Sequence, residues 1–384
     1  MCRHSTSRRD FFRDMILGPT AGASLLSLAA VRAAWAQAVS ANAPTNLFDI
    51  QPVAEDVYFA FARPQAVANC NATIFVNRAD VLVVDAHSKP SAASALIAQI
   101  RKQITPKPVR YLVDTHFHWD HAQGNAGYRE AFGKDLKIIS SATTRKLEAT
   151  LLAPRLQASL DPHGHPFSSQ PHIPVLLDDA RKQMGAAHSA QQRAALAERI
   201  RQLESFEREM QNFRPELPTV TFDKSYVIRD KAHDLYVEFH GRAHTAGDVV
   251  VYCPQKRVVA TGDMVIGTLP FLGDSYPKEW PKTIDSVAKL DFNRVCGGHG
   301  NVAHGKQRMM DQRNYIEELA ERVEKGKTAG LSFADIQKSI PVASIKAFSV
   351  DNYGALVSSG RDLSSMQQAV DTNIEHIYTR LGQT

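Results

Sequence analysis

One short segment gathers four side chains that could bind a metal ion together. Residues 114–125, DTHFHWDHAQGN, hold three histidines and one aspartate within six positions: His116, His118, Asp120 and His121. Imidazole and carboxylate groups are preferred ligands of zinc and of similar divalent cations. The segment follows the apolar run VRYLVDT, so we expect these ligands in a loop at the end of a buried strand. A loop lets ligands one or two positions apart converge on one ion.

Three more potential ligands stand further along the chain, each where an apolar, β-type run ends. His244 follows LYVEF, Asp263 ends RVVATGD, and His299 lies in VCGGHG. The other histidines lack this setting, and we expect no functional role for His4, His87, His188, His233, His304 or His376. His163, His165 and His172 lie in a loop, for which a solvated surface is favoured over an extra metal site. His240 either supports His244 or is simply packed.

Together, the seven potential ligands resemble the metal-binding set of the metallo-β-lactamase superfamily, over roughly residues 50–305. The resemblance implies an α/β fold, the metallo-β-lactamase αββα sandwich, in which two mixed sheets carry helices on their outer faces. It also implies two divalent metal ions, with zinc as the first choice. Carried over position by position, the first metal would be held by His116, His118 and His244, and the second by Asp120, His121 and His299, with Asp263 bridging both. Asp85, which closes the run VLVVDA, matches the strand-end aspartate that braces the ligand loop without binding metal.

This resemblance implies hydrolysis. Two divalent metals in one cleft supply a hydroxide nucleophile near neutral pH, which would attack an ester, lactone or amide carbonyl of a small molecule. Asp120 is the candidate catalytic residue, because it could orient the nucleophile and shuttle its proton. The sequence contains no G-x-S-x-G segment that would point to a serine nucleophile instead.

Two alternatives to this hydrolase remain open. The β-lactamases of the superfamily generally have Cys or Ser where this chain has Asp263, whereas other hydrolases of the superfamily have Asp there. A β-lactamase is therefore the first alternative. A metal-binding accessory protein without turnover is the second, and a complete ligand set argues against it.

The N-terminus resembles a bacterial export signal. Paired Arg8 and Arg9 are followed by aromatic residues, a moderately apolar stretch and then Ala34-Trp35-Ala36, which fits the cleavage rule. We expect residues 1–36 to be a twin-arginine signal peptide, the mature protein to be periplasmic or secreted, and no stable membrane insertion after cleavage.

The net charge limits the classes of partner that can be expected. The formal net charge is +5, and residues 1–36 supply three of these charges (five Arg less two Asp), which leaves 5 − 3 = +2 for the remainder. Such a small excess predicts no nucleic-acid partner, so the expected partner is a small-molecule substrate.

The cysteines form no CxxC pair. Cys253 and Cys296 are expected to be buried small hydrophobes, although Cys296, three residues before His299, could lie near the site.

The elements that must position these residues fall into two sets. Short β-type runs at 57–61, 73–76, 81–86 and 109–115, with a helix at 91–104, precede the first ligands; runs at 226–229, 235–239, 248–253 and 257–263 precede the later ones. A helix is expected from Pro281, with Ile284, Val287 and Leu290 on one face. We expect one metallo-β-lactamase domain over 47–305, with a helical extension over 306–384.

Residues 145–218 interrupt this pattern and are expected to be a mostly helical insertion. Within it, 189–211 predicts a helix whose apolar stripe docks onto its own domain or, less favoured, forms a homo-oligomer: Leu196, Ile200, Leu203 and Met210. The segment GTLPFLGDSYPKEWP (267–281) contributes Phe271, Tyr276 and Trp280, which either wall an apolar pocket over the metals or belong to the core.

Overall fold

The computed structural model describes residues 47–63, 70–167, 170–267, 269–347 and 363–381. The expected signal peptide, residues 1–36, lies outside the described residues. Among those described, no helix combines the length and the apolar character that a membrane crossing requires.

The first half of the chain builds a seven-stranded mixed sheet in sequence order. Its first four strands pair antiparallel, and β4 to β7 pair parallel. Every residue of β3 and β4 is buried, as expected of strands covered on both faces. The strands are β1 (Phe48–Ala54), β2 (Val57–Ala62), β3 (Ala72–Val76), β4 (Val81–Val84), β5 (Val109–Val113), β6 (Lys137–Ser141) and β7 (Val220–Phe222).

The second half builds a six-stranded sheet, in the order β13-β12-β11-β10-β9-β8. All its neighbours are antiparallel except β11 and β12, which are parallel. The strands are β8 (Ser225–Ile228), β9 (Leu235–Glu238), β10 (Val250–Cys253), β11 (Val258–Gly262), β12 (Arg294–Gly297) and β13 (Ala303–His304).

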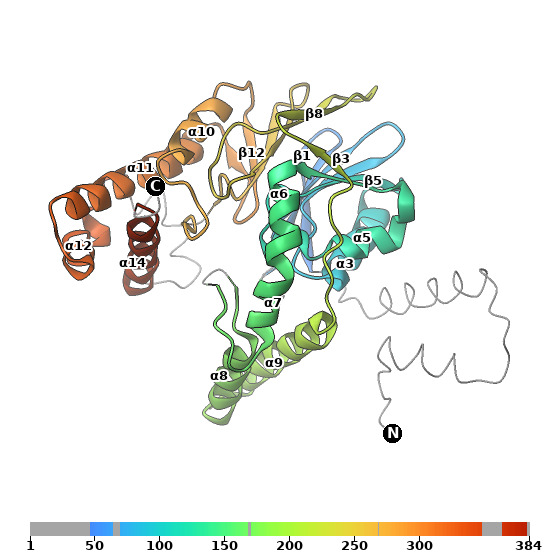
Figure 1. Ribbon diagram of the computed structural model, residues 1–384. Coiled ribbons are helices and arrows are strands. Elements are labelled where there is room, and N and C mark those ends of the chain that lie inside the picture. The colour runs from blue at the N-terminus through green and yellow to red at the C-terminus, as the bar shows by residue number, and fades with distance from the viewer. Residues whose placement is uncertain (1–46, 64–69, 168–169, 268, 348–362, 382–384) are drawn as a thin grey trace. The chain divides into compact units, whose positions relative to one another are not determined.

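Three layers of apolar side chains hold the two sheets and their helices together. One layer joins the sheets, with Phe59 and Phe75 of the first sheet packed with Val251 of the second. Helix α3 (Pro90–Gln103) covers the outer face of the first sheet together with α5 (Asn125–Phe132). Helices α10 (Trp280–Val287) and α11 (Gln307–Thr328) cover the second (Figure 1). The fold is therefore the αββα sandwich that the sequence predicts.

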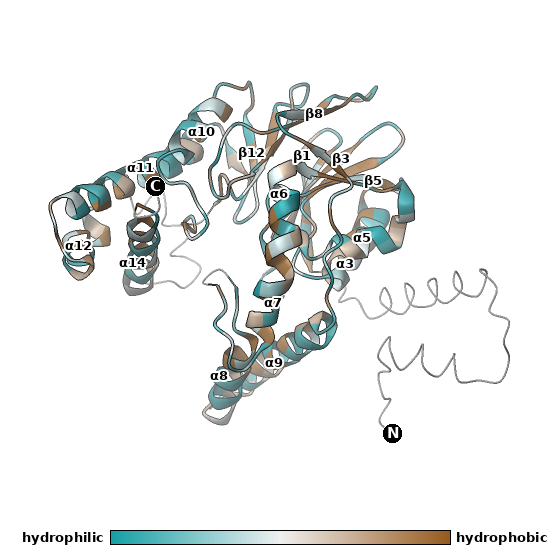
Figure 2. Cartoon of the chain, viewed as in Figure 1, coloured by the Kyte–Doolittle hydropathy of each residue, from teal (hydrophilic) through white to brown (hydrophobic). Residues whose placement is uncertain are grey.

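Helices occupy most of the chain between β6 and β7: α6 (Ala142–Leu147), a π-helical turn η2 (Glu148–Leu152), α7 (Ala153–Leu160), α8 (Ile173–Gly185) and α9 (Ala190–Met210). Helix α9 begins at a capping box formed by Ser189 and Gln192, and most of its surface is hydrophilic (Figure 2). Its C-terminal half buries Leu203 and Met210, together with Phe206, against Trp119 and neighbouring helices. This apolar stripe packs onto the chain's own domain.

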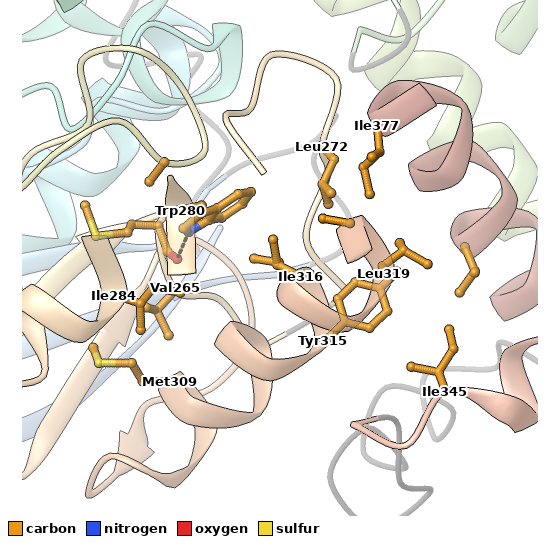
Figure 3. Close-up of a cluster of buried hydrophobic side chains, with 14 of the residues drawn as sticks. Val265, Leu272, Trp280, Ile284, Met309, Tyr315, Ile316, Leu319, Ile345 and Ile377 are labelled. Carbon is orange, nitrogen blue, oxygen red and sulfur yellow. Dashed lines mark hydrogen bonds between the residues drawn. The ribbon is translucent and has the colours of Figure 1, made fainter. Parts of the chain in front are cut away.

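The C-terminal helices share a core with the second sheet (Figure 3). Helices α11, α12 (Phe333–Ser339) and α14 (Leu363–Arg380) pack around Tyr315 and Leu319. Trp280 is fully buried there and donates a hydrogen bond from Nε1 to the carbonyl of Met264 (3.0 Å). Trp280 is thus a core residue rather than a pocket wall. Helix α10 ends at Val287, so the expectation that Leu290 lies on this helix is wrong.

Candidate metal centre

The histidines from both sheets meet at one end of the sandwich, and three of them are fixed in the same way. His121 Nδ1 donates to Asp85 Oδ2 (2.9 Å), and His244 Nδ1 donates to the carbonyl of Phe271 (3.1 Å). His116 Nδ1 lies 3.0 Å from the Thr115 hydroxyl, which donates to Asp85 and can therefore accept the histidine proton. Each ring thus presents its Nε2 lone pair to the interior of the site.

Two groups of three ligand atoms arise from this arrangement. The ligand atoms of His116, His118 and His244 lie within 4.8 Å of one another, and the same limit holds for those of Asp120, His121 and His299. Residues Trp119–Ala122 form one turn of helix, α4, so the ligand segment is a loop that continues into a helical turn. Both groups match the sets that the resemblance implies.

Asp263 lies between the two groups. Its Oδ1 is 3.3 Å from His121 Nε2, and its Oδ2 is 3.6 Å from His244 Nε2 and 3.4 Å from His299 Nε2. One carboxylate therefore reaches ligands of both groups, as a bridging ligand must.

Two glycines allow the strands of the second sheet to approach this site. Gly262 has a φ of +51°, and a Cβ there would overlap the Thr115 side chain. A Cβ on Gly298 would overlap Asp263 Oδ1 and the His121 ring. The motifs ATGD and CGGHG thus bring Asp263 and His299 next to the ligands of the first sheet.

Asp85 fixes the ligand loop from behind. It is buried and has a φ of +69°, at the end of β4. Its Oδ1 accepts hydrogen bonds from the backbone amide and the hydroxyl of Thr115, both at 2.9 Å, while its Oδ2 accepts from His121. This is the bracing contact expected for Asp85, and it supports one ligand of each group.

The chemistry of this donor set fits divalent cations. His116 Nε2, His121 Nε2 and Asp263 Oδ1 are buried without a hydrogen-bond partner among the residues that the structure describes. Such orphaned atoms are costly unless an ion or water completes them. Two carboxylates and five imidazoles at one point also match the ligand preference of zinc, with manganese and iron as acceptable alternatives.

The pKa values of the ligands show which of them hold protons in the absence of a metal. Burial would lower the pKa of His299, but the carboxylates of Asp263 and Asp120 raise it to about 10. Burial and the neighbouring His118 lower the pKa of His244 to about 3. Burial also lowers the pKa of His116 well below its usual range. His116 and His244 are therefore neutral imidazoles ready for a cation, whereas at His299 a cation must displace a proton.

Exposure shows from which side a substrate can enter. The side chains of His116, His121 and His244 are at most 1% exposed, whereas the side chain of His299 is 29% exposed. The second group therefore reaches the mouth of the site through His299, whereas the histidines of the first group lie deeper.

Comparison with known proteins agrees with this geometry. The family model described as metallo-beta-lactamase superfamily matches residues 66–299, which is more than half of the chain and ends on His299. The chain belongs to the metallo-β-lactamase superfamily.

Individual relatives in this superfamily are distant. The chain is 28% identical over 85 residues to a metallo-beta-lactamase type 2 of Elizabethkingia meningoseptica (21% of this chain, 34% of that protein). It is 34% identical over 70 residues to the corresponding protein of Bacillus cereus (17% of this chain, 27% of that protein). The matches thus span about a third or less of those relatives. The solved structure of a stereoselective inverting sec-alkylsulfatase from Pseudomonas sp. aligns with a TM-score of 0.59 and 18% identity, over 88% of this chain and 50% of that chain, and shows the fold alone.

This metallo-β-lactamase superfamily member also contains a carboxylate beside its first ligand group that the sequence analysis did not identify. His118 Nε2 donates to Asp274 Oδ2 (2.9 Å). Burial would raise the pKa of Asp274, but hydrogen bonds from Arg155 and His118 hold it well below its usual range. Asp274 lies in the segment singled out for its aromatic residues, and no spacing rule connects it to a histidine 156 positions earlier.

Among the described residues, Cys70 is the cysteine that lies beside the ligands. Its Sγ lies within 4.8 Å of ligand atoms of Asp85 and His121 and 3.6 Å from His87 Nδ1. Burial raises the pKa of Cys70 to about 12, so it is a neutral thiol. Cys296, for which a place near the site was considered, packs in the apolar layer between the sheets instead.

Of the aromatic residues whose roles were left open, Trp280 and Phe271 both lie beside the ligands. The ring centroid of the buried Trp280 lies 5.5 Å from that of His244. The ring centroid of Phe271, which is partly exposed, lies 6.1 Å from that of His118 and 5.1 Å from that of His376, which was expected to be ordinary. Tyr276 stacks against the guanidinium group of Arg242 instead. His240 contacts Ser286 and Glu238 and is packed away from the ligands. Within the described ranges, His163, His165 and His172 form no ligand group.

Proposed function

We propose that this protein is a metal-dependent hydrolase that attacks an ester, lactone or amide carbonyl of a small molecule. The observation that supports it most directly is the pair of three-residue ligand groups joined by the carboxylate of Asp263. Two divalent cations, with zinc as the first choice, supply an activated water and an electrophile for the substrate oxygen when bound. We also propose that the mature enzyme acts in the periplasm, and that 145–218 and 306–384 are additions to a domain over 47–305.

The residues of the chain then have distinct tasks. His116, His118 and His244 would hold the deeper cation. His121, His299 and Asp120 would hold the outer one, and Asp263 would bridge the two. Asp120 Oδ2 lies 3.1 Å from His299 Nε2, so we assign its Oδ1 to accept the proton of the attacking water.

Phe271 is the best candidate to contact an apolar part of the substrate. It is partly exposed beside the deeper ligand group, and Phe167 lies next to it with ring centroids 6.2 Å apart. An apolar wall beside a metal centre favours a substrate with a carbonyl attached to a hydrophobic group.

A β-lactam is the second candidate substrate. The support for it is the sequence match to two proteins described as metallo-beta-lactamase type 2. Asp263 argues against it, because the resemblance implies Cys or Ser at this position in β-lactamases. A sulfate ester is worth testing beside it, because the alkylsulfatase shares the fold.

The test is a substrate panel on protein of known metal content. Wild-type protein loaded with zinc should contain two metals per chain and hydrolyse an aryl ester or a lactone, and a chelator should abolish turnover. Asp263→Ala should lose most activity and one metal, because both groups lose a shared ligand. Efficient turnover of a chromogenic cephalosporin would move the assignment to β-lactamase. Two bound metals with no turnover of any ester, lactone, lactam or sulfate ester would contradict catalysis.

A further inference from the structure

His118 differs from the other ligands in how its outer nitrogen is held. The three other histidines of the interior contact a hydroxyl, a carbonyl or Asp85 within the two sheets and their adjoining loops. His118 is reversed: its Nδ1 faces inward, 2.9 Å from His244 Nε2, and its Nε2 donates to Asp274. Asp274 lies on the loop before α10, and its side chain is 10% exposed.

Asp274 is itself held by two arginines from outside the sandwich. Arg155 of α7 donates two hydrogen bonds, from Nη1 to Oδ2 (2.7 Å) and from Nη2 to Oδ1 (2.9 Å). Arg380, in the last turn of α14, lies 3.7 Å from Oδ1 and donates to the carbonyl of Gly273 (3.0 Å). A two-point arginine–carboxylate pair fixes the plane of the carboxylate as well as its position.

Arg155 has its own packing constraints. Its guanidinium group lies 3.9 Å from the ring centroid of Phe167 and 5.1 Å from that of Phe117, and its side chain is only 16% exposed. Two aromatic rings and one carboxylate therefore leave this side chain little freedom.

We propose that Asp274 is a positioning residue for the deeper metal, and that Arg155 and Arg380 hold it in place. By accepting the Nε2 proton of His118, Asp274 leaves the Nδ1 lone pair pointing at His116 and His244. The insertion and the C-terminal helix thus complete the deeper ligand group from outside the sandwich. This inference rests on the proposed function, since it requires that the group binds a metal.

The test measures metal affinity one site at a time. His299→Ala disables the outer group and His118→Ala disables the deeper one, so each background retains one site. In the His299→Ala background, Asp274→Asn should weaken zinc binding about 10- to 100-fold in competition with a chromophoric chelator. The visible spectrum of bound cobalt should change as well. In the His118→Ala background the same substitution should leave zinc affinity unchanged.

A matched control separates positioning from stability. Asp285→Asn breaks another arginine–carboxylate pair, with Arg313, on the second sheet's helical cover, and it should leave both affinities unchanged. If Asp274→Asn does not fold, Arg155→Gln and Arg380→Gln keep the carboxylate and should each weaken the deeper site alone.

The outcomes distinguish the two claims. Equal loss at both sites, or no loss at the deeper one, would overturn the positioning role while leaving the hydrolase intact. A His299→Ala protein that binds no metal, although wild type binds two, would overturn the deeper site itself and therefore both claims.

Discussion

The interior histidines each use one ring nitrogen for the protein and keep the other for a cation. Because the outer partners differ, the protonation of the two groups differs. His116 and His244 are neutral near pH 7, while the pKa of His299 is raised to about 10 by Asp263 and Asp120 against the effect of burial. A proton and a metal therefore compete for the outer group much more than for the deeper one.

This competition predicts a pH dependence that differs between the sites. Zinc at the outer group must displace the proton of His299, and the pKa of His121 in the same group is raised as well against the effect of burial. The apparent affinity should therefore rise at least about tenfold per pH unit between pH 6 and 9. The deeper site should change far less in that range, because His244 already lacks a proton there. Titration calorimetry in buffers of different ionisation enthalpy would count the released protons. Equal slopes at the two sites would contradict the assignment.

The strand end that carries His299 makes a second prediction. Gly298→Ala adds a methyl group that overlaps Asp263 Oδ1 and the His121 ring, so it should reduce turnover at least tenfold and lower the zinc content. The control is Gly185→Ala, at the end of α8, where a Cβ meets no atom within 4 Å. It should retain full turnover, and a Gly298→Ala enzyme with normal metal content and rate would contradict this account of the turn.

The helices between β6 and β7 are joined to the ligand-bearing turn by the apolar end of α9. Phe206 is fully buried, and its ring packs against that of Trp119, a residue of the ligand-bearing turn α4. Phe206→Ala should lower the free energy of unfolding by about 3–5 kcal/mol, measured by urea denaturation. Leu196→Ala, on the half-buried end of the same helix, should cost under about 1 kcal/mol. Sedimentation should show the same mass for both variants and wild type, because the stripe is used within the chain; dissociation of an oligomer by Phe206→Ala would contradict this.

Only some residues of the site can be predicted from local patterns in the sequence. The strand-end residues of the site could be predicted because a polar residue that closes an apolar run is visible locally, as with Asp85, which braces the ligand loop, and with the ligand Asp263. Asp274 and Arg155 could not, because their contact depends on how a loop and helix α7, 119 positions apart, fold together. Phe271 and Trp280 share one segment and have similar character, yet only packing against Met264 decides that the second is core.

For the whole molecule, the ligands come from both halves of the sandwich. His116, His118, Asp120 and His121 follow strand β5 of the first sheet, and His244, Asp263 and His299 follow strands of the second.

Because bound metal joins the two halves, its removal should lower the melting temperature. A ligand present at a thousand times its dissociation constant contributes about 4 kcal/mol of stability. Calorimetry with and without a chelator measures the shift, and His116→Ala should largely abolish it. A chelator-independent melting temperature would contradict binding across both halves.

The near-complete burial of the deeper ligands has a kinetic consequence. His116 and His244 are 1% exposed and follow strands of different sheets, so we expect an ion bound by both to leave slowly unless the two halves move apart at this end. The rate of its release should then follow the rate at which the two halves separate there. The rate of isotope exchange at the deeper site would then measure the rate at which the native sandwich opens in the absence of denaturant.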